Sequence, residues 1–379
     1  MKTLNIASKF LVFLMLTLIS SIPLSSISKH YIAVQQHPNT IRIIITNLEN
    51  KDISNVVLKL NLSPWGCPMS IVLENSTRNI PFAYEYENGE VGSDPSKWCG
   101  SVWLRIPGPI PAFSSVALLV RFYGECRASS GDSIFLFYDD FNDGTLSNVW
   151  STHFARATES NGYLFLYQTD STKNNIVLAN INITRPFAIE IKMKMQSSPH
   201  PYDHIGVCCC VQKIFNLTGH PMGYKTGVGA SSDPYARIVL VTGEDKEIVL
   251  SQTQISFSLD SWIIMRFILL SNGSIESIIC NESLKLLAFD SNYVQGSIGI
   301  CCDLESEIPA VIDFIKVYRY HRITYAIERI RNMTELQEGT EKLPTLLTLY
   351  IGISALVGFG IGIFVGILLK RKKLDSQLC

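Results

Sequence analysis

Three consecutive cysteines, Cys208 to Cys210, stand in the apolar run GVCCCVQ, where thiols could bind a metal, attack a substrate or form disulfides. Successive side chains of a strand point to opposite faces, so Cys209 should share a face with Val207 and Val211, while Cys208 and Cys210 face the other way. Three thiolates that point two ways cannot converge on one tetrahedral zinc ion. No adjacent histidine could activate a thiolate as a nucleophile. The run therefore indicates either disulfides or small buried apolar side chains.

Paired carboxylates are the other pattern that could carry chemistry. The stretches EDKE (Glu244 to Glu247) and DLESE (Asp303 to Glu307) are typical of solvated turns between strands rather than of catalytic pairs. The sequence contains no Gly-x-Ser-x-Gly elbow, no His-Glu-x-x-His motif and no phosphate-binding loop. We therefore expect no catalytic site.

Both ends of the chain indicate a type I membrane protein. Residues 1–28 run from a charged start through an apolar stretch to small residues, which is the order of a secretory signal peptide. Residues 346–369 carry no charge and precede the basic run KRKK. Because basic residues stay on the cytoplasmic side, 344–369 is predicted to be one transmembrane helix and 370–379 a cytoplasmic tail. The chain before the span should then face outward from the cell membrane.

Two further patterns fit this topology. N-x-S/T sequons occur about twice as often as composition predicts, all before the predicted span, and indicate N-glycosylation. The seven asparagines are Asn61, Asn75, Asn182, Asn216, Asn272, Asn281 and Asn332. Small residues at every fourth position of the span favour close pairing with a second helix, and hence self-association. These are Ser354, Gly358, Gly362 and Gly366.

An outward location is oxidising and favours disulfides. The second part of the ectodomain holds Cys208, Cys209, Cys210, Cys280, Cys301 and Cys302. If the strands of GVCCCVQ and GSIGICCD are neighbours, matching of faces favours Cys209 with Cys302. It also favours Cys208 or Cys210 with Cys301, which leaves Cys280 for the remaining cysteine. In the first part, Cys67 and Cys99 are expected to pair, and Cys126 is left odd.

Composition and periodicity predict a β-rich ectodomain. Charged residues are only 17%, the net charge is −1 and no basic patch exists outside the tail, which argues against a nucleic-acid partner. In VVLKLNLS the three leucines share one face, and in FAIEIKMKMQ the apolar residues from Ile189 to Met195 alternate with Glu190 and two lysines. Such strands belong to antiparallel sheets with one solvated face.

The order of these patterns predicts an all-β fold with two domains. A polar stretch from 126 to 133 separates a small β-sandwich (29–128) from a second sandwich (133–320). Apolar residues at helical spacing from Ile323 to Met333 then predict a stalk helix over 321–343 that leads to the membrane.

Both predicted domains resemble known families. IPFAYEYENG, SVWLRIPGPIPAFSSVALLVRFYG and SIFLFYDDFNDG occur in the order found in domain of unknown function 2341, over about residues 30–135. That family occurs in prokaryotic surface and secreted proteins, although CPMSIVLEN stands where it usually has an Asp-rich turn. YDDFNDGTLSNVW, DSWIIMRFILLSNGSIESIIC, GSIGICCD and VIDFIKVYRY resemble the concanavalin-like and laminin-G-like jelly rolls, over about 135–320. This second resemblance implies a jelly-roll sandwich, a fold on which sugars are frequent ligands.

The jelly-roll resemblance also implies candidate sites. Carboxylates on the first and last strands of such folds can hold a structural Ca²⁺, and here these would be Asp139, Asp140, Asp143 and Asp313, with turn formation as the alternative role. No other cofactor is expected. Retaining glucanases of this fold use two carboxylates on one strand face. The segment IEIKMKMQ, which is the best equivalent in this sequence, offers only Glu190. Tyr163, Phe165 and Tyr167 alternate and could stack on a sugar, but a place in the core explains them better.

These observations favour a type I single-pass cell-surface glycoprotein. Its expected role is non-enzymatic, either in binding of glycans or adhesion, or in the structure of the envelope. The membrane is one expected partner, and glycans or envelope proteins are others. The alternative is a membrane-anchored glycoside hydrolase that acts on an extracellular polysaccharide, which would need a carboxylate pair that the sequence does not display.

Overall fold

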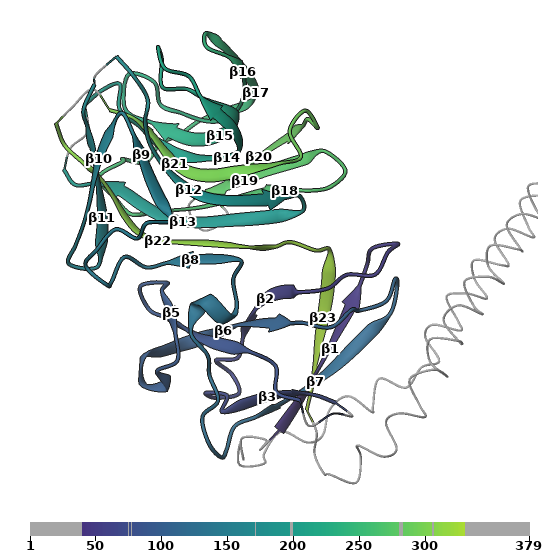
Figure 1. Ribbon diagram of the computed structural model, residues 1–379. Helices are drawn as coiled ribbons and strands as arrows, with labels where there is room; N and C mark the ends of the chain where they lie inside the picture. The colour runs from purple at the N-terminus through teal and green to yellow at the C-terminus, as the bar shows by residue number, and fades with distance from the viewer. Residues whose placement is uncertain are drawn as a thin grey trace, which may run out of the picture. The chain divides into compact units, whose positions relative to one another are not determined.

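The computed structural model describes residues 40–329, apart from 75, 77, 171, 198, 199, 280–282, 305 and 306. Over these residues the chain is all-β with two short 3₁₀ helices, and its strands pair antiparallel in four sheets (Figure 1). Within the same residues no helix is long and apolar enough to cross a membrane. The predicted signal peptide, transmembrane helix and tail lie outside the described residues, as do Asn75, Asn281, Asn332 and Cys280.

A small sandwich is formed by two four-stranded sheets, ordered β23-β1-β7-β3 and β2-β6-β4-β5. Its strands are β1 (Thr40–Asn47), β2 (Val56–Asn61), β3 (Ser70–Leu73), β4 (Phe82–Tyr86), β5 (Val91–Gly92), β6 (Trp98–Ile106), β7 (Ser115–Arg121) and β23 (Ile323–Arg329), and η2 (Pro95–Lys97) precedes β6. Alternate residues of the strands other than β5 fill one core, to which β1 contributes Ile41, Ile43 and Ile45. Leu58 and Leu60 of β2 are buried in that core while Lys59 and Asn61 are exposed, which confirms the predicted alternation.

The chain returns to the small sandwich after the large one. β23 pairs antiparallel with β1 over seven residue pairs and adds an edge strand to its sheet. The predicted stalk helix over 321–343 is therefore wrong over Ile323–Arg329, and the rest of it lies outside the described residues. ITYAIER also alternates with period two, and the edge of β1 offers a complete row of backbone partners, so sheet pairing overrides the helical spacing.

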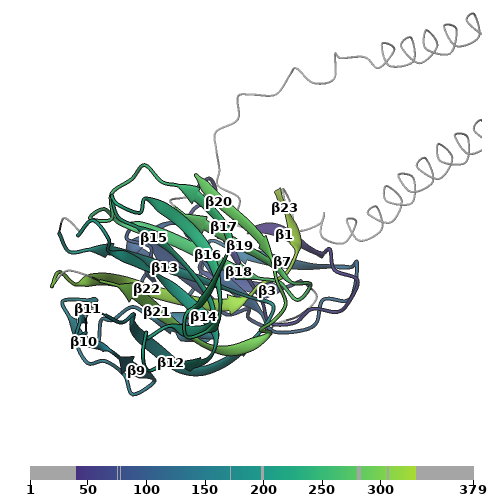
Figure 2. The ribbon, with the colours of Figure 1, turned by 90° about the horizontal axis from the view of Figure 1, so that it is seen from above.

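A large sandwich follows the polar segment that contains η3 (Gly131–Ser133). Its eight-stranded sheet runs β10-β11-β22-β13-β18-β19-β20 with β8 beside β22, and its seven-stranded sheet runs β17-β16-β15-β14-β21-β12-β9 (Figures 1 and 2). The strands are β8 (Phe137–Asp139), β9 (Trp150–His153), β10 (Ala155–Ser160), β11 (Tyr163–Gln168), β12 (Asn175–Thr184), β13 (Phe187–Met195), β14 (His204–Ile214), β15 (Pro221–Gly229), β16 (Tyr235–Gly243), β17 (Lys246–Gln254), β18 (Ile263–Leu269), β19 (Ser274–Ile279), β20 (Leu284–Phe289), β21 (Gln295–Asp303) and β22 (Ala310–Arg319).

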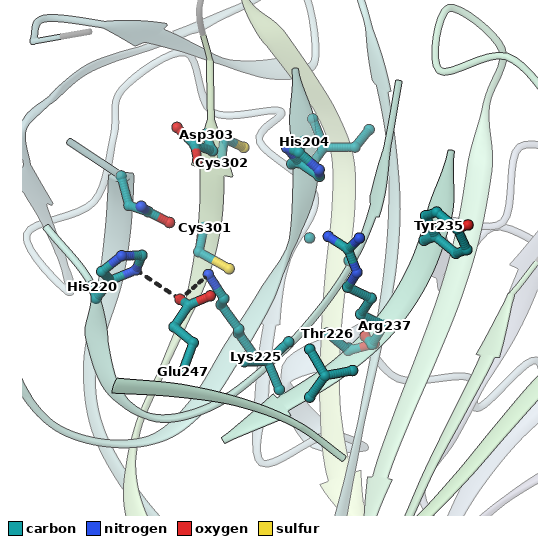
Figure 3. Close-up of a pocket in the computed structure, with 16 residues that line it drawn as sticks. His204, His220, Lys225, Thr226, Tyr235, Arg237, Glu247, Cys301, Cys302 and Asp303 are labelled. Atoms are coloured by element: carbon teal, nitrogen blue, oxygen red, sulfur yellow. Dashed lines mark hydrogen bonds and ion pairs between the residues drawn. The ribbon is translucent and has the colours of Figure 1, made fainter. Parts of the chain in front are cut away.

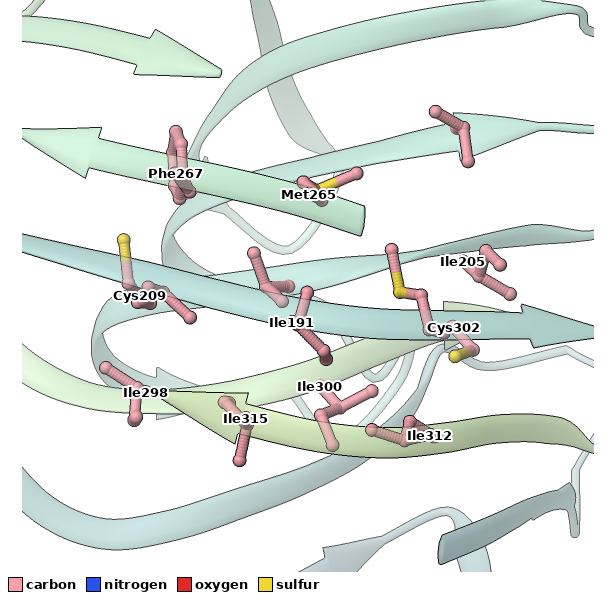
Figure 4. Close-up of a cluster of buried hydrophobic side chains, with 14 of the residues drawn as sticks. Ile191, Ile205, Cys209, Met265, Phe267, Ile298, Ile300, Cys302, Ile312 and Ile315 are labelled. Atoms are coloured by element: carbon pink, nitrogen blue, oxygen red, sulfur yellow. The ribbon is translucent and has the colours of Figure 1, made fainter. Parts of the chain in front are cut away.

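The core of the large sandwich lies between these two sheets. Ile191 of β13, Phe267 of β18 and Ile315 of β22 point toward Cys209 of β14 and Ile300 of β21 (Figure 4). The apolar face predicted for FAIEIKMKMQ is confirmed, because Ile189, Ile191, Met193 and Met195 are all buried in this core. A polar contact also joins the two sheets through this core, since the Thr226 hydroxyl lies 2.8 Å from the Ser277 hydroxyl of the opposite sheet.

The outer face of the eight-stranded sheet is not the solvated face that the alternation predicts. Glu190 is only 4% exposed and pairs with Arg266 at 2.9 Å and with Lys316 at 3.0 Å. The Lys316 ammonium also donates to the carbonyl oxygen of Gly89, in the turn between β4 and β5 of the small sandwich, at 2.7 Å. Residues of the small sandwich thus cover Glu190. In FAIEIKMKMQ the polar position 190 therefore takes part in a buried ionic contact and is not exposed to water.

Candidate functional site

The outer face of the seven-stranded sheet carries a hollow of about 170 Å³. Its lining comes from β14, β15, β16, β17 and β21, together with Asn174 and His220 (Figure 3). This volume is below the roughly 300–1,000 Å³ of sites that enclose drug-sized ligands. The hollow is therefore suited to one small polar unit, either free or at the end of a longer chain. We call it the sheet hollow.

The floor of the sheet hollow is made by two glycines. Gly206 of β14 and Gly227 of β15 are direct partners in the ladder, with Arg237 of β16 beyond Gly227 and Cys301 of β21 beyond Gly206. Their neighbours Ile205 and Val228 point into the core, so positions 206 and 227 face outward and present no side chain. A Cβ at Gly227 would lie 2.7 Å from the carbonyl oxygen of Ile205, which shows how closely the backbones approach. Side chains on the flanking positions become the walls.

One wall is an ionic cluster around Glu247. The carboxylate of Glu247 lies 2.5 Å from Lys225 Nζ and 2.8 Å from His220 Nδ1 (Figure 3). Burial alone would raise the pKa of Glu247, but the contact with His220 and the charge of Lys225 outweigh it and lower that pKa to about 2. Glu247 is therefore an ionised hydrogen-bond acceptor at neutral pH, held in one place by its contacts with Lys225 and His220.

A second cluster lies around Asp233, in the loop before β16. Asp233 accepts both guanidinium Nη–H groups of Arg237 and lies 2.8 Å from His204 Nε2. Burial acts to raise the pKa of Asp233, but the hydrogen bonds from Arg237 and His204 lower it overall. Gly229 permits this packing, because a Cβ there would lie 2.6 Å from the ring of His204. Tyr235, whose ring lies 5.2 Å from the Arg237 guanidinium, adds an aromatic edge to the hollow.

The sheet hollow cannot be recognised in the sequence, because the residues that line it are scattered over five strands. EDKE and DLESE were interpreted as solvated turns, yet Glu247 belongs to β17 and Asp303 is the last residue of β21, and both line the hollow. The available signal was the pair of glycines in HIGVCCC and KTGVGA, since glycine inside a strand often marks a close approach of backbone or ligand. That Gly206 and Gly227 lie opposite each other becomes evident only when the register between β14 and β15 is known.

The three consecutive cysteines lie at a β-bulge that changes their expected faces. Cys208 packs on the outer face and Cys209 in the core, as predicted, but Cys210 has a φ of +52° and also joins the core. The predictions that Cys208 and Cys210 share a face and that Cys209 shares a face with Val211 are therefore wrong, because Val211 packs on the outer face with Cys208. The bulge is accommodated by Gly223 and Gly296 on the flanking strands, whose Cβ atoms would lie within 3 Å of the Cys210 backbone.

The predicted pair of Cys209 with Cys302 is also wrong. Cys302 lies opposite Ile205, four residues before Cys209, and four residues of strand span about 13 Å, whereas bridged Cα atoms lie within about 7 Å. Cys208 and Cys301 do lie together on the outer face, and their thiol hydrogen bond, followed by burial, raises the pKa of Cys208. All eight described cysteines are thiols in this structure.

The four aspartates of the predicted calcium site are each engaged elsewhere. β8 does pair with β22, but Asp139 accepts from Trp150 Nε1 at 2.7 Å and Asp313 pairs with Lys192 at 2.6 Å. Asp140 lies 3.2 Å from the Tyr138 hydroxyl, and Asp143 accepts from the Thr145 amide. Among residues 40–329 as described, no group of three or more His, Cys, Asp or Glu side chains is arranged to hold a metal ion. The arrangement of these aspartates does not favour calcium.

Two other sets of predicted residues lie on the surface. Tyr163, Phe165 and Tyr167 point outward from β11 while Leu164 and Leu166 fill the core, so the interpretation of this aromatic row as core is wrong. Tyr163 packs against Trp262, with ring centroids 5.7 Å apart. The four described sequon asparagines, Asn61, Asn182, Asn216 and Asn272, are all exposed.

Comparison with known proteins finds similarity only among solved structures. No protein-family model matches the chain and no curated protein matches it, so the resemblance to domain of unknown function 2341 stays a prediction. Carbohydrate-binding module CBM66 from Bacillus subtilis has 11% identity over 46% of this chain and 99% of its own, with a TM-score of 0.36. The carbohydrate recognition domain of Emp47p has 13% identity over 48% and 93%, with a TM-score of 0.39.

A glycosyl hydrolase family 16 protein from Mycobacterium smegmatis is similar to the same extent. It has 9% identity over 48% of this chain and 100% of its own, with a TM-score of 0.36. Identities and TM-scores this low assign neither an activity nor a ligand to this chain.

Proposed function

We propose that this protein is a non-catalytic carbohydrate-binding protein and that the sheet hollow holds one sugar unit of its glycan. The observation that carries the proposal is the position of Gly206 and Gly227 between the two ionic clusters. The two glycines leave a small open space, and the clusters place hydrogen-bond donors and acceptors in fixed positions around it. Sugar hydroxyls both donate and accept hydrogen bonds. Glu247 and Asp303 supply carboxylates, while Lys225 and Arg237 supply N–H donors at the walls.

The state of Glu247 supports binding rather than hydrolysis. A glycosidase acid must carry a proton near neutral pH, which requires a raised pKa. The donors around Glu247 do the opposite and keep its carboxylate ionised. Asp233 is likewise held by Arg237 and His204. Glu247, which lines the hollow, is therefore suited to accept a hydrogen bond from a bound sugar, while Asp233 holds Arg237 and His204 in place beside it.

The proposal places the protein at the cell surface, with residues 344–369 as its membrane anchor. The exposure of the four described sequon asparagines is consistent with glycosylation of an outward-facing chain. The small sandwich, which covers the outer face of the other sheet around Glu190 and Lys316, leaves the seven-stranded sheet as the face for a ligand. Self-association through the small residues Ser354, Gly358, Gly362 and Gly366 of the predicted transmembrane helix would add avidity for a repeated glycan.

A binding screen tests the proposal. The full-length chain, kept in detergent because of its apolar C-terminal segment, would be titrated with a panel of neutral and acidic polysaccharides and oligosaccharides, with and without a calcium chelator. Saturable binding without release of products is the expected result. Shortening of a bound glycan would instead assign the protein to the hydrolases, and no binding to any glycan would leave an envelope-structural role.

A further inference from the structure

Cys67 and Cys126 meet at one buried hydroxyl in the small sandwich. Tyr84 of β4 is fully buried, and its hydroxyl donates to the carbonyl oxygen of Pro68 at 2.5 Å. The Cys126 sulfur lies 3.3 Å from the same oxygen, and because the only hydroxyl proton is already donated to Pro68, the Cys126 thiol is the donor in this contact. The Cys67 thiol lies close enough to both Tyr84 and Cys126 for each to shift its pKa. Two thiols from distant parts of the sequence thus share one small space.

The backbone holds the two segments side by side. The amide of Met69, two residues after Cys67, donates to Arg121 at 2.8 Å. The carbonyl oxygen of Met69 accepts from the amide of Arg127, the residue after Cys126, at 2.9 Å. Met69 is therefore hydrogen-bonded to both ends of the segment 121–127. This proximity is set by hydrogen bonds of the fold and not by a chance orientation of two side chains.

We propose that Cys67 and Cys126 form a disulfide that fastens the segment after β7 to the small sandwich. The sequence favours a pair of Cys67 with Cys99 and leaves Cys126 without a partner, whereas the fold brings Cys126 close to Cys67. Cys99 is exposed on β6 and is the expected free thiol of this region. The disulfide would hold the start of the connection from β7 (Ser115–Arg121) to η3 (Gly131–Ser133), through which the chain passes from one sandwich to the other.

The chemistry is thiol–disulfide exchange with a small-molecule or dithiol-enzyme disulfide as the oxidant. Cys126 is exposed and meets the oxidant first, while burial raises the pKa of the half-buried Cys67. The Cys126 thiolate attacks one sulfur of the oxidant, whose second sulfur leaves as a thiolate. Cys67, as its thiolate, then attacks the Cys126 sulfur and displaces the remaining oxidant thiol. Two electrons pass to the oxidant, which leaves as two thiols with the two protons that the cysteines lose.

Tryptic mapping tests the pairing cleanly, because Cys67, Cys99 and Cys126 each lie on a different peptide. Cleavage after lysine and arginine places Cys67 on 60–78, Cys99 on 98–105 and Cys126 on 122–127. The full-length chain would be oxidised with glutathione disulfide, alkylated without reductant, enzymatically deglycosylated because 60–78 carries the Asn61 and Asn75 sequons, and digested. The expected result is a linked pair of 60–78 and 122–127 that reductant separates, with 98–105 alkylated.

Two variants sharpen this test. Cys99→Ser should leave the linked pair unchanged, and Cys67→Ser should leave Cys126 alkylated. A link between 60–78 and 98–105 would overturn the proposal in favour of the pairing predicted from sequence. Alkylation of both Cys67 and Cys126 in the oxidised wild-type chain would overturn it as well. The wild-type map decides the matter even if a cysteine variant fails to fold.

Discussion

Lys225 and Glu247 form an ion pair that reaches over an intervening strand. Lys225 lies on β15 and Glu247 on β17, with β16 between them, and Nζ of Lys225 lies 2.5 Å from Oε1 of Glu247. Neighbouring strands are about 4.8 Å apart, so the two side chains together bridge roughly 10 Å of sheet. Their ion pair fixes both groups at the wall of the sheet hollow. Several measurable consequences depend on this pair and on the packing around it.

The stability that Glu247 contributes should depend on pH. The folded-state pKa of Glu247, about 2, lies below its ordinary value of 4.5, so its contribution is fully present above pH 4.5 and is lost as pH falls toward 2. Because the side chain is about a third exposed, solvent screening limits this contribution to about 1 kcal/mol. The difference in unfolding free energy between wild type and Glu247→Gln, measured by urea titration, should shrink from pH 7 to pH 3. A difference that stays constant over this range would contradict the assignment.

The buried pair of Glu190 and Lys316 should respond strongly to single substitutions. Removal of one partner leaves the other charge uncompensated, so Glu190→Gln or Lys316→Met should each lower the unfolding free energy by about 3–5 kcal/mol. The double variant should lose less than the sum of the two. The matched control is the more exposed pair of Lys285 and Glu276, where the same substitutions should change stability by less than about 1 kcal/mol. Equal effects at both pairs would show that Glu190 is not covered.

The bulge at Cys210 should require glycine at position 296. A Cβ at Gly296 would lie 2.5 Å from the Cys210 carbonyl carbon, and its φ of +148° lies in the region that favours glycine. Gly296→Ala should therefore lower the unfolding free energy by about 1–3 kcal/mol. Gly108→Ala, where a Cβ would meet nothing within 4 Å, serves as the control and should change stability little. A neutral Gly296→Ala variant would mean that the bulge is placed differently.

The sequons offer a test of the outward location. If the chain is secreted through a pathway with N-glycosylation, Asn61, Asn182, Asn216 and Asn272 are exposed enough to carry glycans. Enzymatic deglycosylation should then lower the apparent mass, and glycopeptide mapping should find at least these sites modified. A mature chain from its own source with no glycan at any of the four would contradict the surface location.

The sequence predicted well those features that depend on one strand at a time. The alternation in VVLKLNLS and FAIEIKMKMQ correctly placed the leucines of the first and Ile189 to Met195 in two separate cores. The same alternation failed at Cys210, because a bulge adds one residue and reverses the faces that follow. It failed again at Glu190, where the polar face is covered by a second domain.

Features that depend on the register between strands could not be predicted from the sequence. Gly206 and Gly227 are separated by twenty residues in the chain, and only their direct pairing makes them the floor of a hollow. Cys67 and Cys126 likewise meet through the backbone contacts of Met69 and not through spacing. The strand β23 was mistaken for a helix because ITYAIER fits both periods, and the open edge of β1 decides between them.

The most direct test of the central claim is a titration of the full-length chain with its best glycan, comparing Lys225→Met with Lys285→Met. Both substitutions remove a lysine from an ion pair, but only Lys225 lines the sheet hollow. Hydrogen bonds to charged groups contribute about 1.5–3 kcal/mol, so Lys225→Met should weaken binding by about tenfold or more, while Lys285→Met should leave it unchanged. Equal affinities for both variants and the wild type would show that the sugar binds elsewhere.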